Sequence, residues 1–205
     1  MSASTTDKGL LTPGNCAVVF IDFQPPWLAE VSGTNRETLL QNILVLAKAA
    51  LIFDVPVIFT CLYSSEPAAA LRELFPHIRS IARSTMNAWD CPEFQEAVRR
   101  TGRRNLVMAA LWSEVSLTMP ALQALTDGFG VYAVEDASEA ASTAVGAQAA
   151  AIRRIEQAGA VSITALQLLL EFQRDWSRPP HQAEVLAVMH LHCRHLRCAP
   201  PALPG

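Results

Sequence analysis

The chain has 205 residues, of which 51% are hydrophobic and 17% are charged, and its formal net charge is −3. This composition predicts one compact domain with a well-buried core and excludes an intrinsically disordered chain. A small negative charge without any basic run makes nucleic acid and anionic membrane surfaces poor partners. No apolar run reaches the roughly 18–20 residues that a membrane span needs.

Short apolar runs alternate with amphipathic stretches along the chain. The runs expected to be buried strands are 16–23, 55–62, 105–111, 130–138 and 160–165. Helical spacing is expected at 36–50, 93–101, 115–127 and 146–158. Uninterrupted apolar strands that alternate with helices are typical of a parallel sheet covered on both faces. The sequence therefore predicts an α/β fold of three layers (αβα) around an open parallel sheet.

Glycines mark where three of these helices should end. Gly102, Gly128 and Gly159 each stand between a helical stretch and the next strand. Glycine adopts the left-handed conformation that often closes a helix, so we expect these positions to be helix C-termini.

The C-terminal part breaks the alternation of strands and helices. We expect a single domain over residues 1–176 and a helical arm over 177–205, with a helix at about 182–198 that packs on a neighbouring subunit. His192, His195 and Cys198 recur at three-residue spacing, which raises the possibility of a metal site. No standard zinc-ligand spacing appears, so an amphipathic arm is the preferred interpretation, and no metal or cofactor is expected.

The cysteines and the N-terminal residues bear on the compartment. Five cysteines are an odd number scattered through the chain, which favours free thiols in a reducing compartment. The first residues are polar and do not follow the pattern of a secretion signal. We therefore expect a cytoplasmic protein.

Three reactive side chains are predicted near the carboxyl ends of strands, where open α/β sheets bind their ligands. Asp22 directly follows an apolar run, and alone it could equally be a turn or helix-capping residue. Ser116 lies at the start of a helix, where backbone N–H groups favour negative charge, although an ordinary first-turn serine fits too. Arg83 lies in a long irregular link, where it could also be a solvated surface residue. Together they suggest acyl transfer by a nucleophile, a proton acceptor and a cation.

The motifs around these residues resemble one known family. "VVFIDFQ", "VPVIFT", "IARSTMNAWDCPEF", "LVMAALWSEVSLTMPALQALTDGFGVYAVEDAS" and "IEQAGAVSITALQLLLEFQRDW" follow one another in order over 15–176. They resemble the isochorismatase-like cysteine hydrolases, which include nicotinamidase and N-carbamoylsarcosine amidase. The segments "NAW", "ALWSEV" and "EFQRDW" are similar to those of the YcaC-like branch, whose members form ring-shaped oligomers.

The resemblance implies a role for each matching residue. The family's aspartate falls on Asp22, its lysine or arginine on Arg83, and its nucleophilic cysteine on Ser116. A cis peptide is implied at Leu111–Trp112, which would turn the backbone N–H groups of Trp112 and Ser116 into an oxyanion hole. The segment after the second strand lacks the Asp and His of metal-binding members, so the resemblance implies no metal.

Serine at position 116 departs from the family pattern, and three explanations stay open. In the first, the serine replaces a cysteine in an engineered or inactive form; in the second, the site activates water instead. The third is a non-catalytic protein that binds a small molecule or only assembles. Serine needs a stronger base than cysteine because its hydroxyl is far less acidic.

The predicted function is hydrolysis of a C–N bond in a small amide-type molecule. Phe23, Trp27, Trp89 and Trp112 flank the site residues in sequence and are candidates for the substrate pocket, although some of them could be core residues. We also expect a homo-oligomer, because the apolar content is high and the C-terminal arm is extra. The resemblance to the YcaC-like branch favours a tetramer or an octamer.

Overall fold

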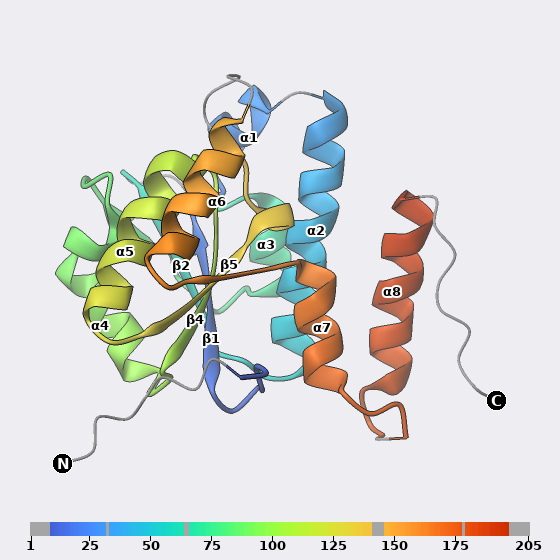
Figure 1. Ribbon diagram of the computed structural model, residues 1–205. Helices are drawn as coiled ribbons and strands as arrows, with labels where there is room; N and C mark the ends of the chain where they lie inside the picture. The colour runs from blue at the N-terminus through green and yellow to red at the C-terminus, as the bar shows by residue number, and fades with distance from the viewer. Residues whose placement is uncertain (1–8, 32, 64–65, 141–145, 178, 197–205) are drawn as a thin grey trace, which may run out of the picture.

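The computed structural model describes residues 9–31, 33–63, 66–140, 146–177 and 179–196, and only the backbone of 33–34 and 194–196. Six parallel strands form one sheet in the order β3-β2-β1-β4-β5-β6 (Figure 1). They are β1 (Cys16–Ile21), β2 (Val57–Leu62), β3 (Ile81–Arg83), β4 (Asn105–Ala110), β5 (Gly130–Val134) and β6 (Val161–Ile163). The predicted α/β fold with an open parallel sheet is confirmed.

The helices cover both faces of this sheet. They are α1 (Pro25–Glu30), α2 (Gly33–Ile52), α3 (Ala69–Leu74), α4 (Pro92–Arg100), α5 (Thr118–Thr126), α6 (Ala147–Gln157), α7 (Ala165–Gln173) and α8 (Gln182–Leu196). Short turns η1 (Ala88–Asp90), η2 (Ser113–Leu117) and η3 (Glu135–Ala137) complete the described elements. Figure 1 shows α4, α5 and α6 on one side of the sheet and α2, α7 and α8 on the other.

The central strand β1 explains why the core forms two layers. All six of its residues are buried, and alternate side chains point to opposite faces. Val18 and Phe20 join the core under α2 and α7, whereas Val19 and Ile21 join the core under α4, α5 and α6. A strand buried on both faces needs no polar positions, which is why its sequence is continuously apolar.

The strand order creates a crevice beside β1. From β1 the chain builds β2 and β3 on one side and then β4, β5 and β6 on the other. The loops after β1 and β4 therefore leave in different directions, and open α/β sheets bind ligands at such a switch point. Asp22 follows β1, and Ser116 follows β4.

The short elements are where the sequence-based assignment was incomplete. β3 has three residues, too few to show a period, and Arg83 ends this strand instead of lying in an irregular link. α1 begins with Pro25 and Pro26, which are tolerated in the first turn of a helix but in sequence resemble a loop. The predicted helix ends at Gly102, Gly128 and Gly159 are confirmed, with φ values of 67°, 85° and 108°.

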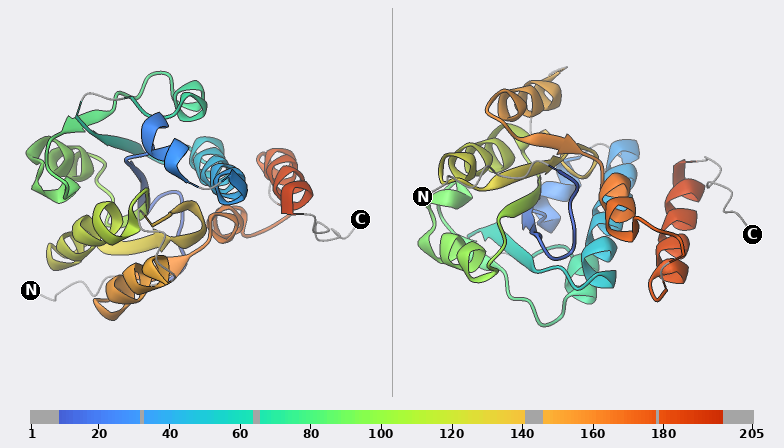
Figure 2. Two further views of the ribbon diagram at one scale, coloured as in Figure 1. Left: turned by 90° about the horizontal axis from the view of Figure 1, so that it is seen from above. Right: turned by 60° about the horizontal axis from the view of Figure 1, so that its bottom comes forward.

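The C-terminal helix α8 packs on its own chain. It contacts α2 and α7, and Figure 2 shows it as an outer layer beyond them. Val185 and Met189 are at most 1% exposed and belong to the same core as β1. The boundary expected at residue 176 therefore does not separate two packing units. Contact with a neighbouring subunit stays a prediction for the outer face of α8.

Within the described residues, no helix combines the length and the apolarity that crossing a membrane requires.

We expect Met189→Ala to lower the free energy of unfolding by about 2–5 kcal/mol, because it removes buried methylene groups and leaves a cavity. Urea denaturation followed by circular dichroism measures the change. Leu191→Ala, on the same helix but 46% exposed, is the matched control and should change it by less than about 0.5 kcal/mol. Equal losses at both positions would mean that the outer face of α8 is covered as well.

Candidate active site

The carboxylate of Asp22 is held by three elements at the carboxyl edge of the sheet. Its Oδ1 accepts a hydrogen bond from the Leu62 backbone N–H at 3.0 Å. Its Oδ2 accepts one from Arg83 Nη2 at 2.5 Å and another from Ser116 Oγ at 2.7 Å. The residue itself is in the left-handed region, with φ 61°. The three predicted catalytic residues therefore meet at one carboxylate.

Asp22 and Arg83 form a buried ion pair. Both side chains are 1% exposed. Arg83 Nη1 also donates to the Thr85 carbonyl, which fixes the guanidinium plane. A buried charge is tolerated when a partner and further hydrogen bonds offset its loss of hydration. Arg83 Nε is buried and has no acceptor among the described residues, so this N–H donor of the guanidinium is unpaired.

Ser116 lies in a π-helical turn, η2, that continues directly into α5. Pro120, in the first turn of α5, has no N–H to donate to the Ser116 carbonyl. Thr118 Oγ1 donates to the Ser113 carbonyl at 2.7 Å. Such wide turns occur often at functional sites. Here the turn places the Ser116 hydroxyl against Asp22, although Ser116 itself is 0% exposed.

The predicted cis peptide is wrong. Among the described residues the cis bond is Pro179–Pro180, and Leu111–Trp112 is trans. The chain reverses here by another means, because Trp112 adopts φ 62° and ψ 62°. Ser113 N–H then donates to the Glu139 carbonyl at 3.0 Å. A left-handed residue thus makes the bend that the resemblance assigns to a cis bond.

The predicted oxyanion hole is not formed in this geometry either. The Ser116 backbone N–H donates to the Trp112 carbonyl at 2.8 Å, as expected inside a helical turn. That donor is therefore occupied, and the trans bond removes the bend expected to aim the Trp112 N–H beside it.

The four aromatic candidates divide into two groups. Trp27 and Trp112 are half-buried, with ring centroids 4.4 Å apart. Phe23 is 1% exposed and packs edge-on against Phe20, so it belongs to the core. Trp89 packs against Phe94 and Phe129, and its indole N–H donates to Asp127 Oδ2 at 2.9 Å. Lining of a substrate pocket stays a prediction for Trp27 and Trp112.

Gln24 is a structural part of the site that the sequence did not single out. It is 1% exposed, and its amide bridges β2, with Nε2 donating to the Leu62 carbonyl at 3.1 Å. Its Oε1 accepts from the Leu62 N–H at 3.1 Å and from Trp27 Nε1 at 3.2 Å. Gln24 therefore ties the backbone that holds Asp22 to one of the two half-buried indoles. A buried polar residue two positions after a strand-end aspartate is the signal that could have found it.

Cys61 is a cysteine close to the site, but it is not a substitute nucleophile. It precedes Leu62 in β2 and is 1% exposed. Burial penalises the thiolate and raises the pKa of this thiol to about 11. The thiolate is the reactive form, so Cys61 is inert near neutral pH.

Metal ligands do not gather in the described parts of the chain, where no three His, Cys, Asp or Glu side chains could share an ion. His192 is buried on α8. The side chains of His195 and Cys198, the other two members of the possible C-terminal site, lie outside the described residues.

Comparison with known proteins matches this arrangement to one family. The Isochorismatase domain covers residues 16–167, a span that includes all six strands. The chain belongs to the isochorismatase family. It is 33% identical over 171 residues to "Probable hydrolase YcaC" of Escherichia coli K12, which is 81% of each chain.

Two solved YcaC structures share the fold of this isochorismatase-family chain along its length. YcaC from Pseudomonas aeruginosa has a TM-score of 0.83 and 30% identity, with 95% of this chain and 98% of that chain covered. YcaC from Escherichia coli, described as an octameric hydrolase of unknown specificity, has a TM-score of 0.80 and 30% identity. It covers 93% of this chain and 92% of its own. The predicted family, its YcaC-like branch and the fold are confirmed.

We expect Gln24→Leu to lower the free energy of unfolding by about 1–3 kcal/mol, because the Leu62 carbonyl and the Trp27 indole N–H both lose their buried partner. Gln167→Leu is the matched control, since that amide bonds to Glu171 Oε1 on the surface. It should stay within about 0.5 kcal/mol of the parent in urea denaturation. An unchanged free energy of unfolding in Gln24→Leu would show that the Gln24 amide does not stabilise the site.

Iodoacetamide at pH 8 should leave Cys61 unmodified in the native protein and modify it fully in urea. Because folding raises its pKa from 9.0 to about 11, the thiol stays protonated in the folded state. The linked stability is fully present below about pH 9 and is lost as the pH rises towards 11. Peptide mass spectrometry measures the labelling, and native labelling of Cys61 at pH 8 would contradict its assigned burial.

Proposed function

We propose that this isochorismatase-family protein hydrolyses a C–N bond of a small amide-type molecule, with Ser116 as nucleophile. The observation that carries the proposal is the 2.7 Å hydrogen bond from Ser116 Oγ to Asp22 Oδ2. It supplies a proton acceptor at the nucleophile, the arrangement that activates hydroxyl and thiol groups in covalent catalysis. The amide class follows from the resemblance to amidases in the sequence motifs.

Asp22, Ser116 and one water molecule account for every proton transferred in the proposed reaction. Ser116 Oγ attacks the carbonyl carbon while its proton passes to Asp22, and the proton then moves to the leaving nitrogen as the C–N bond breaks. Water, giving a proton to Asp22, attacks the resulting ester, releases the acid and restores the Ser116 hydroxyl. Arg83 keeps Asp22 in place through Nη2, and its remaining Nε–H is the donor we assign to the carbonyl oxygen.

A relative supports covalent chemistry in this branch. The structure of YcaC from Pseudomonas aeruginosa is described with hexane-2,5-diol and covalent acrylamide. Acrylamide is itself a small amide, and a covalent bond to it needs a nucleophile on the protein. We propose that position 116 is where the present chain would offer one.

The burial of Ser116 favours a second candidate function. Ser116 is 0% exposed. A buried serine hydroxyl beside a carboxylate that is paired with Arg83 also suits a protein that binds a small molecule, or only assembles, without turnover. The two functions differ in what a stronger nucleophile at position 116 would do.

We expect Ser116→Cys to hydrolyse at least one small amide about a hundredfold faster than the parent, since a thiolate is the stronger nucleophile and Arg83 lies beside Asp22. The assay is a panel of amides and N-carbamoyl compounds, with mass spectrometry watching for an acyl adduct on residue 116. Adding Asp22→Asn should abolish the gain.

Ser113→Cys is the matched control, because Ser113 lies in the same turn and is equally buried but does not contact Asp22. It should gain no turnover. If Ser116→Cys also shows neither turnover nor adduct, the binding or assembly function is favoured instead.

We further expect a homo-oligomer, for which light scattering at micromolar concentration should give a multiple of the 22.3 kDa chain mass. Large apolar side chains are exposed at the carboxyl edge of the sheet, with Tyr63 at 68%, Met86 at 57% and Met119 at 40%. The Escherichia coli relative is described as octameric. A monomer mass alone would contradict this expectation.

A further inference from the structure

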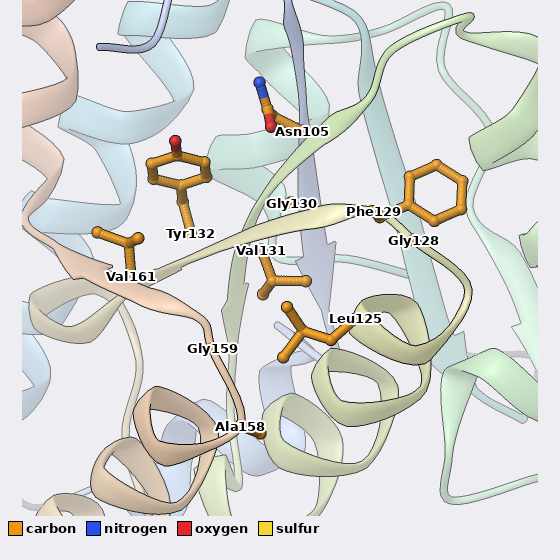
Figure 3. Close-up of a pocket in the computed structure, with 10 residues that line it drawn as sticks. All are labelled: Asn105, Leu125, Gly128, Phe129, Gly130, Val131, Tyr132, Ala158, Gly159 and Val161. Atoms are coloured by element: carbon orange, nitrogen blue, oxygen red, sulfur yellow. The ribbon is translucent and has the colours of Figure 1, made fainter. Parts of the chain in front are cut away.

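A cavity opens at the edge of the sheet opposite Asp22, at the amino ends of β4, β5 and β6. Its volume is about 210 Å³, below the roughly 300–1,000 Å³ of pockets for drug-sized ligands. Figure 3 shows its walls, which come from β4, β5, β6 and the turns that follow α5 and α6. The size suits a small molecule, and the position makes it independent of the proposed reaction.

Gly130 makes room for the Asn105 side chain at the cavity wall. It pairs with Asn105 across β4 and β5, and a Cβ on Gly130 would lie 2.3 Å from Asn105 Oδ1. Figure 3 shows the side chains of Asn105 and Tyr132 directed to the same side of the sheet, with Gly130 between them. The space that a side chain at Gly130 would take is therefore filled by the Asn105 amide, beside the Tyr132 ring.

The walls of the cavity are fixed before any ligand arrives. Asn105 N–H donates to the Asn15 carbonyl at 3.2 Å, and Tyr132 Oη donates to the Gly9 carbonyl at 3.1 Å. The Phe129 ring packs against Trp89, with centroids 5.5 Å apart. A preformed pocket binds more tightly because less ordering is needed on binding.

The side-chain amide of Asn105 is the group that points to a ligand. Asn105 is 6% exposed, and no hydrogen bond joins its side-chain amide to a described residue, but its polar atoms are not fully enclosed by protein. These atoms face the cavity that Asn105 lines, where they can bond water or a ligand. An amide offers two donors and one acceptor in a single plane.

The rest of the lining selects against charge. None of the described residues that line the cavity is charged, and beside Asn105 and Tyr132 they are glycine, alanine, leucine, valine and phenylalanine. A charged ligand would lose its hydration without a counter-charge. We propose that this cavity binds a small, neutral, planar molecule with an amide or lactam edge, which pairs reciprocally with the Asn105 amide.

Benzamide is the probe, and saturation-transfer NMR with the whole protein measures its binding. We expect Asn105→Leu, which has a similar volume and cannot hydrogen-bond, to weaken binding at this cavity at least tenfold. Gly130→Ala should do the same by displacing the Asn105 carbonyl. Gly14→Ala is the matched glycine control, since a Cβ there meets its nearest atom at an ordinary 3.9 Å, and it should leave binding unchanged.

Three further measurements decide between outcomes. Benzoate, which is charged but of the same shape, should bind at least tenfold more weakly than benzamide, and Ser116→Ala should leave the Asn105-dependent binding intact. The melting temperature of Asn105→Leu should not fall, because the amide has no internal partner to lose. Equal benzamide binding by the parent and Asn105→Leu, equal binding of benzoate, or a fall in melting temperature would overturn the proposal.

Discussion

The buried ion pair between Asp22 and Arg83 is the constraint on which the carboxyl edge of the sheet depends. Its two members follow β1 and end β3, and the strand between them, β2, supplies the Leu62 N–H to the same carboxylate. Removing either charge would leave the other buried and uncompensated, which is far more costly than losing an exposed pair. The contact that aligns three strands is therefore the contact that orients the candidate nucleophile, so fold and site cannot vary separately here.

The backbone at two strand ends is shaped by the same requirement. Asp22 and Trp112 both adopt left-handed conformations, with φ values of 61° and 62°. Such conformations are unfavourable for residues other than glycine and persist where the surroundings enforce them. Each reverses the chain directly after a strand, which brings the Asp22 carboxylate and the Ser116 turn to face each other across the switch point of the sheet.

Much of the fold and of the candidate site could be predicted from the sequence, because buried strands have a continuous apolar sequence. Asp22 follows an uninterrupted apolar run, Ser116 begins a helix soon after another, and their strands are neighbours. Arg83 was a candidate, but its three-residue strand has no readable period. The reversal at Trp112 was expected, yet sequence cannot distinguish a cis peptide from a left-handed residue, because both reverse the chain.

Proximity in sequence was also a poor guide to which aromatic rings lie together. Trp89 follows the Arg83 segment closely, but its ring joins the core under α4 and α5. Trp27 and Trp112 are far apart in the chain, and nevertheless their tilted rings are in contact near the site. The side on which a ring lies depends on the turn between strand and helix, and that turn carries little periodic signal.

The two outermost strands have a consequence for how copies of the chain can meet. β3 and β6 are each three residues long, so each edge of the sheet exposes only a short row of unpaired backbone groups. Short edge strands are a common protection against edge-to-edge pairing and aggregation. An assembly of this protein is therefore directed to helix and loop surfaces, where side chains select the partner, and not to an extended intermolecular sheet.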